Sequence, residues 1–267
     1  MVTLSPILKL DDRKTFGVLG ALSLDLVVVR LQDLICKRTF KFNETYRQIV
    51  SQQGLHNFLN FNGKILLSLI MKDQIIANLN PERYSEAIHS LKPDSFTTVD
   101  GETYEGEFVC STAELERITK ENNKLLDLAS DFKPVGLVKG CSEVLIKNHA
   151  QQLKSKGIDE YIFHVSDFLR NGGKPDLINK ARLYALTIRP FAKNLILYGV
   201  GSSKLHNKFS FADKYVTFTH FINATHRKKV VGNKIMTCLN AYNENTITEN
   251  FINMYYTVES LEKQQTM

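Results

Sequence analysis

The side chains best suited to chemistry are carboxylates in the segment LKPDSFTTVDGETYEGE, Leu91–Glu107. Its β-branched and aromatic run, Phe96–Val99, predicts a strand, and four carboxylates and two glycines follow within eight residues. A packed core would not accept that composition, so the acids belong on a loop at the strand end. Asp100 and Glu102, with Tyr104 beside them, suit acid and base catalysis, or acceptance of hydrogen bonds from a purine-like ring. A solvated acidic turn is the alternative.

Two other strand ends carry candidate residues. His164 directly follows the apolar run YIF and stands three residues before Asp167, so in a barrel both would face the same mouth. Another strand leads into Gly199 and Gly201, and glycines there let a ligand approach the backbone closely. Their spacing does not fit a dinucleotide fingerprint, so a nicotinamide site is rejected.

Predicted strands alternate with helices along the chain. Strands lie near residues 65, 95, 135, 161, 195 and 215, and early strands within Phe16–Arg30 bring the total to seven or eight. We therefore predict an α/β fold with a mainly parallel sheet, a (β/α)8 TIM-like barrel, and an open doubly wound sheet is the alternative. In either fold, functional groups follow the carboxyl ends of strands. The further residues that this rule selects are Ser68, Lys139, Gly140, Thr219 and His220.

Helices are predicted where apolar residues recur at helical spacing. Pro81 opens one helix, Gly157 ends another in a left-handed conformation, and Ser111 or Thr112 caps a third. Residues 1–230 are predicted to form the barrel, and residues 231–267 a C-terminal helical extension packed on it. The main predicted helices are 43–53, Pro81–Leu91, Ser111–Ala129, Ser142–Lys156, Asp176–Arg189 and Thr246–Glu262.

Composition indicates a globular chain. Of its 267 residues, 43% are hydrophobic and 23% charged. No apolar run approaches the roughly 20 residues that cross a bilayer, and the first residues lack a secretory pattern, so we expect a soluble cytoplasmic protein without a membrane partner. The four cysteines form no C-x-x-C pair, which argues against a local zinc motif. We predict neither a metal nor a cofactor.

Positive charge is concentrated late in the chain. The formal net charge is +6, and Arg227, Lys228 and Lys229 form a basic cluster with His226 and Lys234 nearby. This cluster is the candidate contact for nucleic acid, and a solvated basic face is the alternative.

Several segments, in collinear order over Gly54–Lys229, resemble the tRNA-guanine transglycosylases. GLHNFLNFNGKILLS resembles that family's G-L-H-x-F-x-x-F-x-G-P-I-x-T-D-S-G, and PVGLVKG its F-G-I-V-Q-G strand. KSKGIDEYIFHV, NLILYGVGSS and FADKYVTFTHFINATHRK resemble three later segments. The resemblance implies a (β/α)8 barrel that handles guanine or a 7-deazaguanine, such as preQ0 or queuine, at a glycosidic bond of tRNA or DNA. It also implies an aspartate nucleophile.

The chain departs from the family pattern at several positions. Ser68 stands where the family has the aspartate of T-D-S-G, and Val216 falls at the nucleophile. Lys139 replaces a glutamine, His164–Val165 replaces paired glycines, and the family's cysteine-rich zinc site has no counterpart. Asp100 matches the aspartate that reads the base edge in the family.

Three hypotheses follow. The first, narrowly preferred, is a divergent base-exchange transglycosylase whose carboxylate comes from Asp100, Asp167 or, less readily, Asp213, which lies nearer the amino end of its strand. The second is a non-catalytic relative, either a subunit of an active enzyme or a base-binding or tRNA-binding protein. The third is an unrelated barrel enzyme that acts on a small phosphorylated metabolite, with the loop Gly199–Ser203 as its phosphate site. The sequence is compatible with a monomer or with a homo- or hetero-oligomer.

Overall fold

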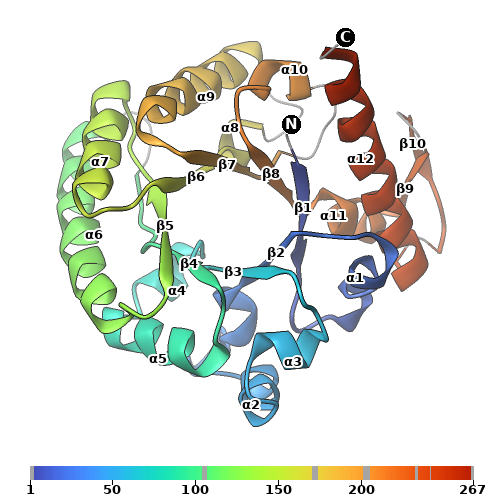
Figure 1. Cartoon of the computed structure of the whole chain (residues 1–267), viewed down its shortest axis with the longest axis horizontal. Coiled ribbons are helices and arrows are strands. Elements are labelled where there is room, and N and C mark those ends of the chain that lie inside the picture. The colour runs from blue at the N-terminus through green and yellow to red at the C-terminus, as the bar shows by residue number, and fades with distance from the viewer. Residues whose placement is uncertain are drawn as a thin grey trace.

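Eight parallel strands close into a barrel with helices around it (Figure 1). The computed structural model describes residues 3–103, 107–169, 174–200, 205–231, 234–240 and 242–265. The strands follow one another around the barrel in chain order, and the last pairs with the first. The predicted (β/α)8 barrel is therefore confirmed, and the open doubly wound sheet is excluded.

The eight strands are short, and most were predicted at nearly the same positions. The prediction missed the first strand, because TLSPIL contains a proline that interrupts the strand pattern. It was also wrong about the start of Phe16–Arg30, where Val18–Ala21 forms the short helix α1. The strands are β1 Thr3–Leu8, β2 Leu26–Arg30, β3 Lys64–Ser68, β4 Ser95–Thr97, β5 Lys133–Val138, β6 Glu160–His164, β7 Asn194–Tyr198 and β8 Lys214–Thr217.

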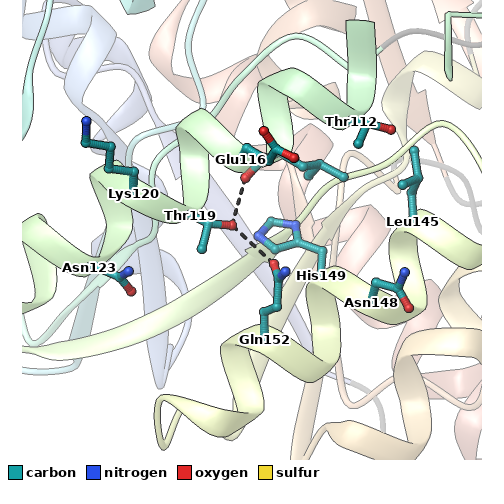
Figure 2. Close-up of a pocket in the computed structure, with 10 residues that line it drawn as sticks. Thr112, Glu116, Thr119, Lys120, Asn123, Leu145, Asn148, His149 and Gln152 are labelled. Atoms are coloured by element: carbon teal, nitrogen blue, oxygen red, sulfur yellow. Dashed lines mark hydrogen bonds between the residues drawn. The ribbon is translucent and has the colours of Figure 1, made fainter. Parts of the chain in front are cut away.

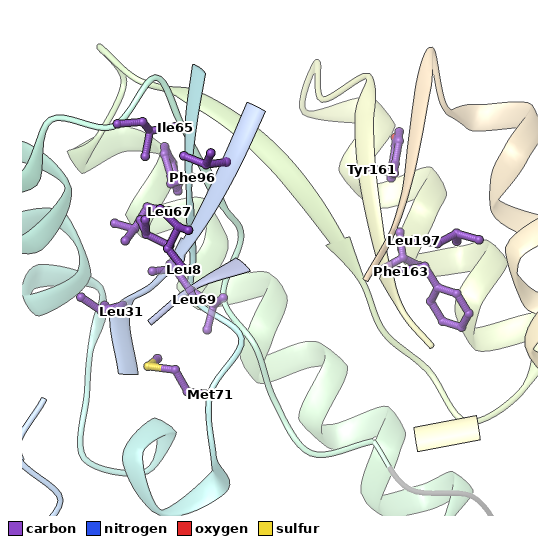
Figure 3. Close-up of a cluster of buried hydrophobic side chains, with 14 of the residues drawn as sticks. Leu8, Leu31, Ile65, Leu67, Leu69, Met71, Phe96, Tyr161, Phe163 and Leu197 are labelled. Atoms are coloured by element: carbon purple, nitrogen blue, oxygen red, sulfur yellow. The ribbon is translucent and has the colours of Figure 1, made fainter. Parts of the chain in front are cut away.

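Alternate residues of each strand serve two separate cores, because successive side chains of a strand point to opposite faces. Val28 and Leu137 belong to the cluster that fills the barrel interior. Leu67, Phe96 and Phe163 belong to the layer between the sheet and its helices, part of which Figure 3 shows. This alternation decides which residue at a strand end points into the mouth of the barrel.

The helices that cover the barrel are unequal in length. The start of α5 was predicted correctly: Pro81 is its first residue, and the Asn80 side chain accepts a hydrogen bond from Arg83 N. The cap predicted for α6 was wrong, since the helix already begins at Phe108 and Ser111 is buried inside it. The α-helices after α1 that the structure describes are α2 Glu44–Ser51, α3 Leu55–Leu59, α4 Asp73–Ile76, α5 Pro81–Leu91, α6 Phe108–Leu128, α7 Glu143–Ser155, α8 Ser166–Leu169, α9 Pro175–Ile188, α10 His206–Phe209, α11 Thr219–Thr225 and α12 Glu244–Gln265. Within this part of the chain, no helix has both the length and the apolarity to cross a membrane.

The C-terminal region closes the ring of helices beside β1 (Figure 1). An antiparallel hairpin, β9 Lys228–Val231 and β10 Lys234–Thr237, precedes α12. Asn250 on α12 ties the hairpin down, because its Oδ1 accepts a hydrogen bond from Val230 N at 2.6 Å. The boundary expected between the barrel and the C-terminal extension, after residue 230, falls inside β9.

Gly157 follows α7 in the left-handed conformation predicted for it, with φ +80°. An alanine Cβ there would meet no atom within 4 Å, so only the backbone conformation opposes it. We expect Gly157→Ala to lower the free energy of unfolding by about 1 kcal/mol in urea denaturation. Gly20→Ala is the matched control, because Gly20 lies in α1 with equally open space and no positive φ. It should be neutral or stabilising by up to about 1 kcal/mol, and equal effects of the two changes would contradict the explanation.

Candidate functional site

A cavity of about 940 Å³ opens at the carboxyl ends of the barrel strands. In four strands, the row of side chains that points into the barrel interior ends with a residue that lines this cavity. These residues are Arg30, Lys139, His164 and Tyr198. Each follows an interior residue by two positions, as Lys139 follows Leu137. Their polar groups therefore converge because of strand geometry.

Asp100 and Lys139 form the central ion pair of the cavity. Lys139 Nζ lies 3.0 Å from Asp100 Oδ1, and both side chains are largely buried, at 17% and 6% exposed. Asp100 Oδ1 also accepts from Gly101 N at 2.8 Å, and Oδ2 accepts from Met71 N at 3.2 Å. An ionised carboxyl group has about four acceptor sites. Three of them are used by residues that the structure describes, which leaves one for a ligand.

The main chain of Lys139 is held from outside the barrel. Its N–H donates to Nδ1 of His149 on α7, at 3.0 Å. His149 is 1% exposed, and burial lowers its pKa to about 4. The imidazole is therefore neutral and fixes the position from which the Lys139 side chain enters the cavity.

Arg30 supplies a second cation, which is also paired. Its guanidinium donates to both carboxylate oxygens of Asp33, at 3.0 and 2.8 Å, and lies 4.3 Å from the ring centroid of Phe218. Burial raises the pKa of Asp33, more than Arg30 lowers it. Arg30 was not predicted from the sequence, although its place two residues after Val28 in LVVVR was the signal.

His164 contacts Ser166, at the start of α8, and Tyr198, on the adjacent strand β7. Its Nε2 hydrogen-bonds Ser166 Oγ, and its ring meets that of Tyr198 edge to face at 5.2 Å. Burial raises the pKa of Tyr198 to about 12. Gly199 has φ +98°, and a Cβ there would lie 2.6 Å from Ser166 Cβ, so only glycine allows this approach.

The structure brings most of the predicted site residues together. Those that line the cavity are Asp100, Glu102, Lys139, Gly140, His164, Gly199 and Thr219. Glu102 is exposed, and the pKa of its carboxyl group is raised by partial desolvation and then by the nearby Asp73 and Glu114.

Ser68 and His220 are not among the residues that line the cavity. Ser68 is fully buried, and its Oγ accepts from Ile70 N at 3.2 Å. His220, on α11, packs its ring 5.2 Å from Phe251 of α12. Its two ring nitrogens find no hydrogen-bond partner in the described ranges, and burial lowers its pKa to about 3. His220 therefore serves the packing of α11 on α12.

Three predicted residues fall wholly or partly outside the described residues. Tyr104 and Gly201 are not among them, and Asp167 lies on α8 with its side chain outside the description. The basic cluster is described: Arg227 and Lys228 are exposed where β9 begins, and the third member, Lys229, pairs with Glu249.

No carboxylate of β8 points into the cavity. Val216, at the position of the family's nucleophile, is fully buried in the barrel interior. Asp213 precedes the strand at its amino end, where Oδ2 accepts from Leu195 N at 2.7 Å and pairs with Arg189 at 3.3 Å. Asp213 is therefore at the far end of the barrel from the cavity.

Fold and cavity together define a (β/α)8 barrel with a cavity lined by charged residues at the mouth, the end at which barrel enzymes bind their substrates. A scan against protein-family models and a search of curated proteins both found no match for this chain. Among the residues that the structure describes, no group of three or more His, Cys, Asp or Glu could hold a metal ion. The function of the chain is therefore inferred from the residues of the cavity.

Proposed function

We propose that the mouth cavity binds guanine or a 7-deazaguanine of the preQ0 or queuine type, presented by tRNA or DNA. The observation that carries this proposal is the Asp100–Lys139 pair, in which an ammonium donor stands 3.0 Å from a carboxylate. The edge of guanine offers a carbonyl oxygen beside an N–H group. Lys139 would donate to that oxygen, and the remaining acceptor site of Asp100 would accept from the N–H.

The walls of the cavity suit a planar ring. Tyr198 and Phe218, which belong to the interior cluster of the barrel, contribute aromatic surface. A base can stack against such walls, as bases do in other single-stranded nucleic-acid sites. The cavity volume of about 940 Å³ lies near the upper end for ligand sites and leaves room for the attached sugar.

The basic cluster would contact the phosphate backbone. α11 begins beside the cavity with Thr219 and ends just before Arg227. Lys229 is engaged by Glu249, so Arg227 and Lys228 would carry the contact. Such contacts weaken with added salt, because binding releases counterions from the nucleic acid.

Base exchange by this chain alone is a second candidate. It requires a carboxylate that attacks the sugar carbon while the base leaves, with the nucleotide taken out of its stack. Glu102 favours this candidate, because it is an exposed carboxylate on the cavity wall. The burial of Val216 favours recognition without exchange, with the missing aspartate supplied by a partner subunit.

Calorimetric titration with free bases tests the proposal. We expect preQ0 and guanine to bind saturably and adenine, which reverses the donor and acceptor on the matching edge, to bind at least about 100-fold more weakly. Inorganic phosphate serves as the control for a phosphate site near Gly199. Equal binding of adenine and guanine, or binding of phosphate alone, would contradict base recognition.

Incubation with labelled preQ0 separates the two candidates. The chain alone should incorporate no label into tRNA or duplex DNA. Incorporation that Glu102→Gln abolishes would instead establish base exchange, with Glu102 as the attacking carboxylate. The Glu116→Gln variant, changed at an exposed acid of α6 away from the mouth cavity, is the matched control.

A further inference from the structure

A second cavity, of about 390 Å³, lies outside the barrel between α6 and α7 (Figure 2). Thr119 of α6 and Gln152 of α7 meet at its wall, where Thr119 Oγ1 donates a hydrogen bond to Gln152 Oε1 at 3.1 Å. The buried ring of His149 forms part of its wall. This groove, defined by Thr119, His149 and Gln152, belongs to neither the mouth cavity nor the proposed base site.

His149 brings an unused hydrogen-bond donor to the groove. A main-chain N–H can only donate, so Nδ1 of His149 must accept from Lys139 N at 3.0 Å. Nδ1 also lies 3.3 Å from Lys139 O. A hydrogen bond to that oxygen would need a proton on Nδ1, and the shorter contact with Lys139 N excludes such a proton. The neutral ring therefore carries its proton on Nε2. That buried N–H finds no partner among the described residues, whereas buried donors in proteins are almost always paired.

The groove surrounds this donor with neutral polar groups. Figure 2 shows the edge of the His149 ring turned toward Thr119 and Gln152. The amides of Asn123 and Asn148 line the groove as well. Hydroxyl and amide groups both donate and accept, which matches ligand hydroxyl groups.

The charges and the apolar surface of the groove restrict the class of ligand further. Glu116 and Lys120 contribute one charge of each sign, so the groove favours no net charge. Leu115 and Leu145 form an apolar part of the wall, against which the carbon face of a ring can pack. A volume of about 390 Å³ is within the range of small-ligand sites.

We propose that the α6–α7 groove binds a neutral polyhydroxylated ring, a monosaccharide or the ribose of a nucleoside, with one ligand hydroxyl accepting from His149 Nε2–H. The same imidazole holds the main chain of Lys139 through Nδ1. A ligand in the groove therefore contacts the residue that positions the cation of the mouth cavity. The groove is a binding site in its own right and does not depend on what the mouth cavity binds.

Ligand-observed NMR titration of the full chain tests this site with D-ribose, D-glucose and uridine. We expect at least one to bind saturably with a Kd on the order of 1 mM. Sugars alone would identify a free monosaccharide, and uridine alone a nucleoside. Uracil also presents a carbonyl oxygen beside an N–H group, so binding of uridine is assigned to the groove only where a substitution in the groove weakens it.

Two substitutions should weaken that binding by about tenfold. His149→Asn keeps an acceptor for Lys139 N–H and removes the Nε2–H donor, and Gln152→Leu removes an amide from the groove. Gln151→Leu is the matched control, an exposed glutamine of α7 that does not line the groove. If no probe saturates, or if Gln151→Leu weakens binding as much as Gln152→Leu, the proposal is overturned. If His149→Asn does not fold, the comparison of Gln152→Leu with Gln151→Leu still tests the proposal.

Discussion

Between pH 7.5 and pH 5, the free energy of unfolding should fall by about 4 kcal/mol because of two buried histidines. Burial lowers the pKa of His149 to about 4 and that of His220 to about 3, from 6.5. Below pH 6.5 these two histidines therefore bind protons in the unfolded chain, whereas in the folded protein they stay neutral. The contribution of the two neutral histidines to the free energy of unfolding is complete above pH 6.5 and is lost as the pH falls toward 4. Urea denaturation at several pH values measures this slope.

His220→Phe should remove about half of that pH dependence. Phe251 and Phe218 surround the His220 ring, and its nitrogens lack partners within the described ranges, so phenylalanine should change the stability at pH 7.5 by less than about 1 kcal/mol. His226→Gln, at an exposed histidine, is the control and should keep the wild-type slope. Parallel slopes for wild type and His220→Phe would contradict the assignment.

Lys139→Met should reduce the affinity for preQ0 or guanine by at least about 100-fold and lower the free energy of unfolding by about 2 to 3 kcal/mol. The change removes the cation from a largely buried pair and leaves the Asp100 carboxylate, among the described residues, with two main-chain donors. Calorimetric titration measures the first effect and urea denaturation the second.

The same strand provides a matched control for Lys139→Met. Lys133, at the other end of β5, pairs with Glu160 at 2.7 Å, but its side chain is 54% exposed. Lys133→Met should therefore lower stability by less than about 1 kcal/mol and leave base binding unchanged. Retained base affinity in Lys139→Met, or equal effects of the two variants, would show that the buried pair is not the recognition element.

Local patterns in the sequence were enough to predict the barrel. Runs of β-branched and apolar residues with intervening helices predict the parallel strands, and Pro81 and Gly157 mark helix ends by their own backbone preferences. The missed strand β1 carries Pro6, so it lacks the local signal, and it is held in place by pairing with β8 and β2. Its neighbours in space, rather than its composition, make it a strand.

The candidate site was predictable to the extent that strand ends define it. Asp100, Lys139 and His164 were selected because each follows a strand, and all three line the cavity. The same rule failed for His220, because β8 ends at Thr217 and the chain turns at once into α11. Sequence position alone does not say whether a residue after a strand faces the mouth or a covering helix.

The sequence by itself determined the α/β alternation, the inward or outward side of each strand residue and the charges at the strand ends, because these depend on neighbours in the chain. Only the tertiary structure decided that Lys139 meets Asp100, that Arg30 lies against Phe218, and that His149 holds Lys139 from outside the barrel. Those contacts join residues on different elements, and they exist only because closure of the barrel and packing of its helices bring those elements together.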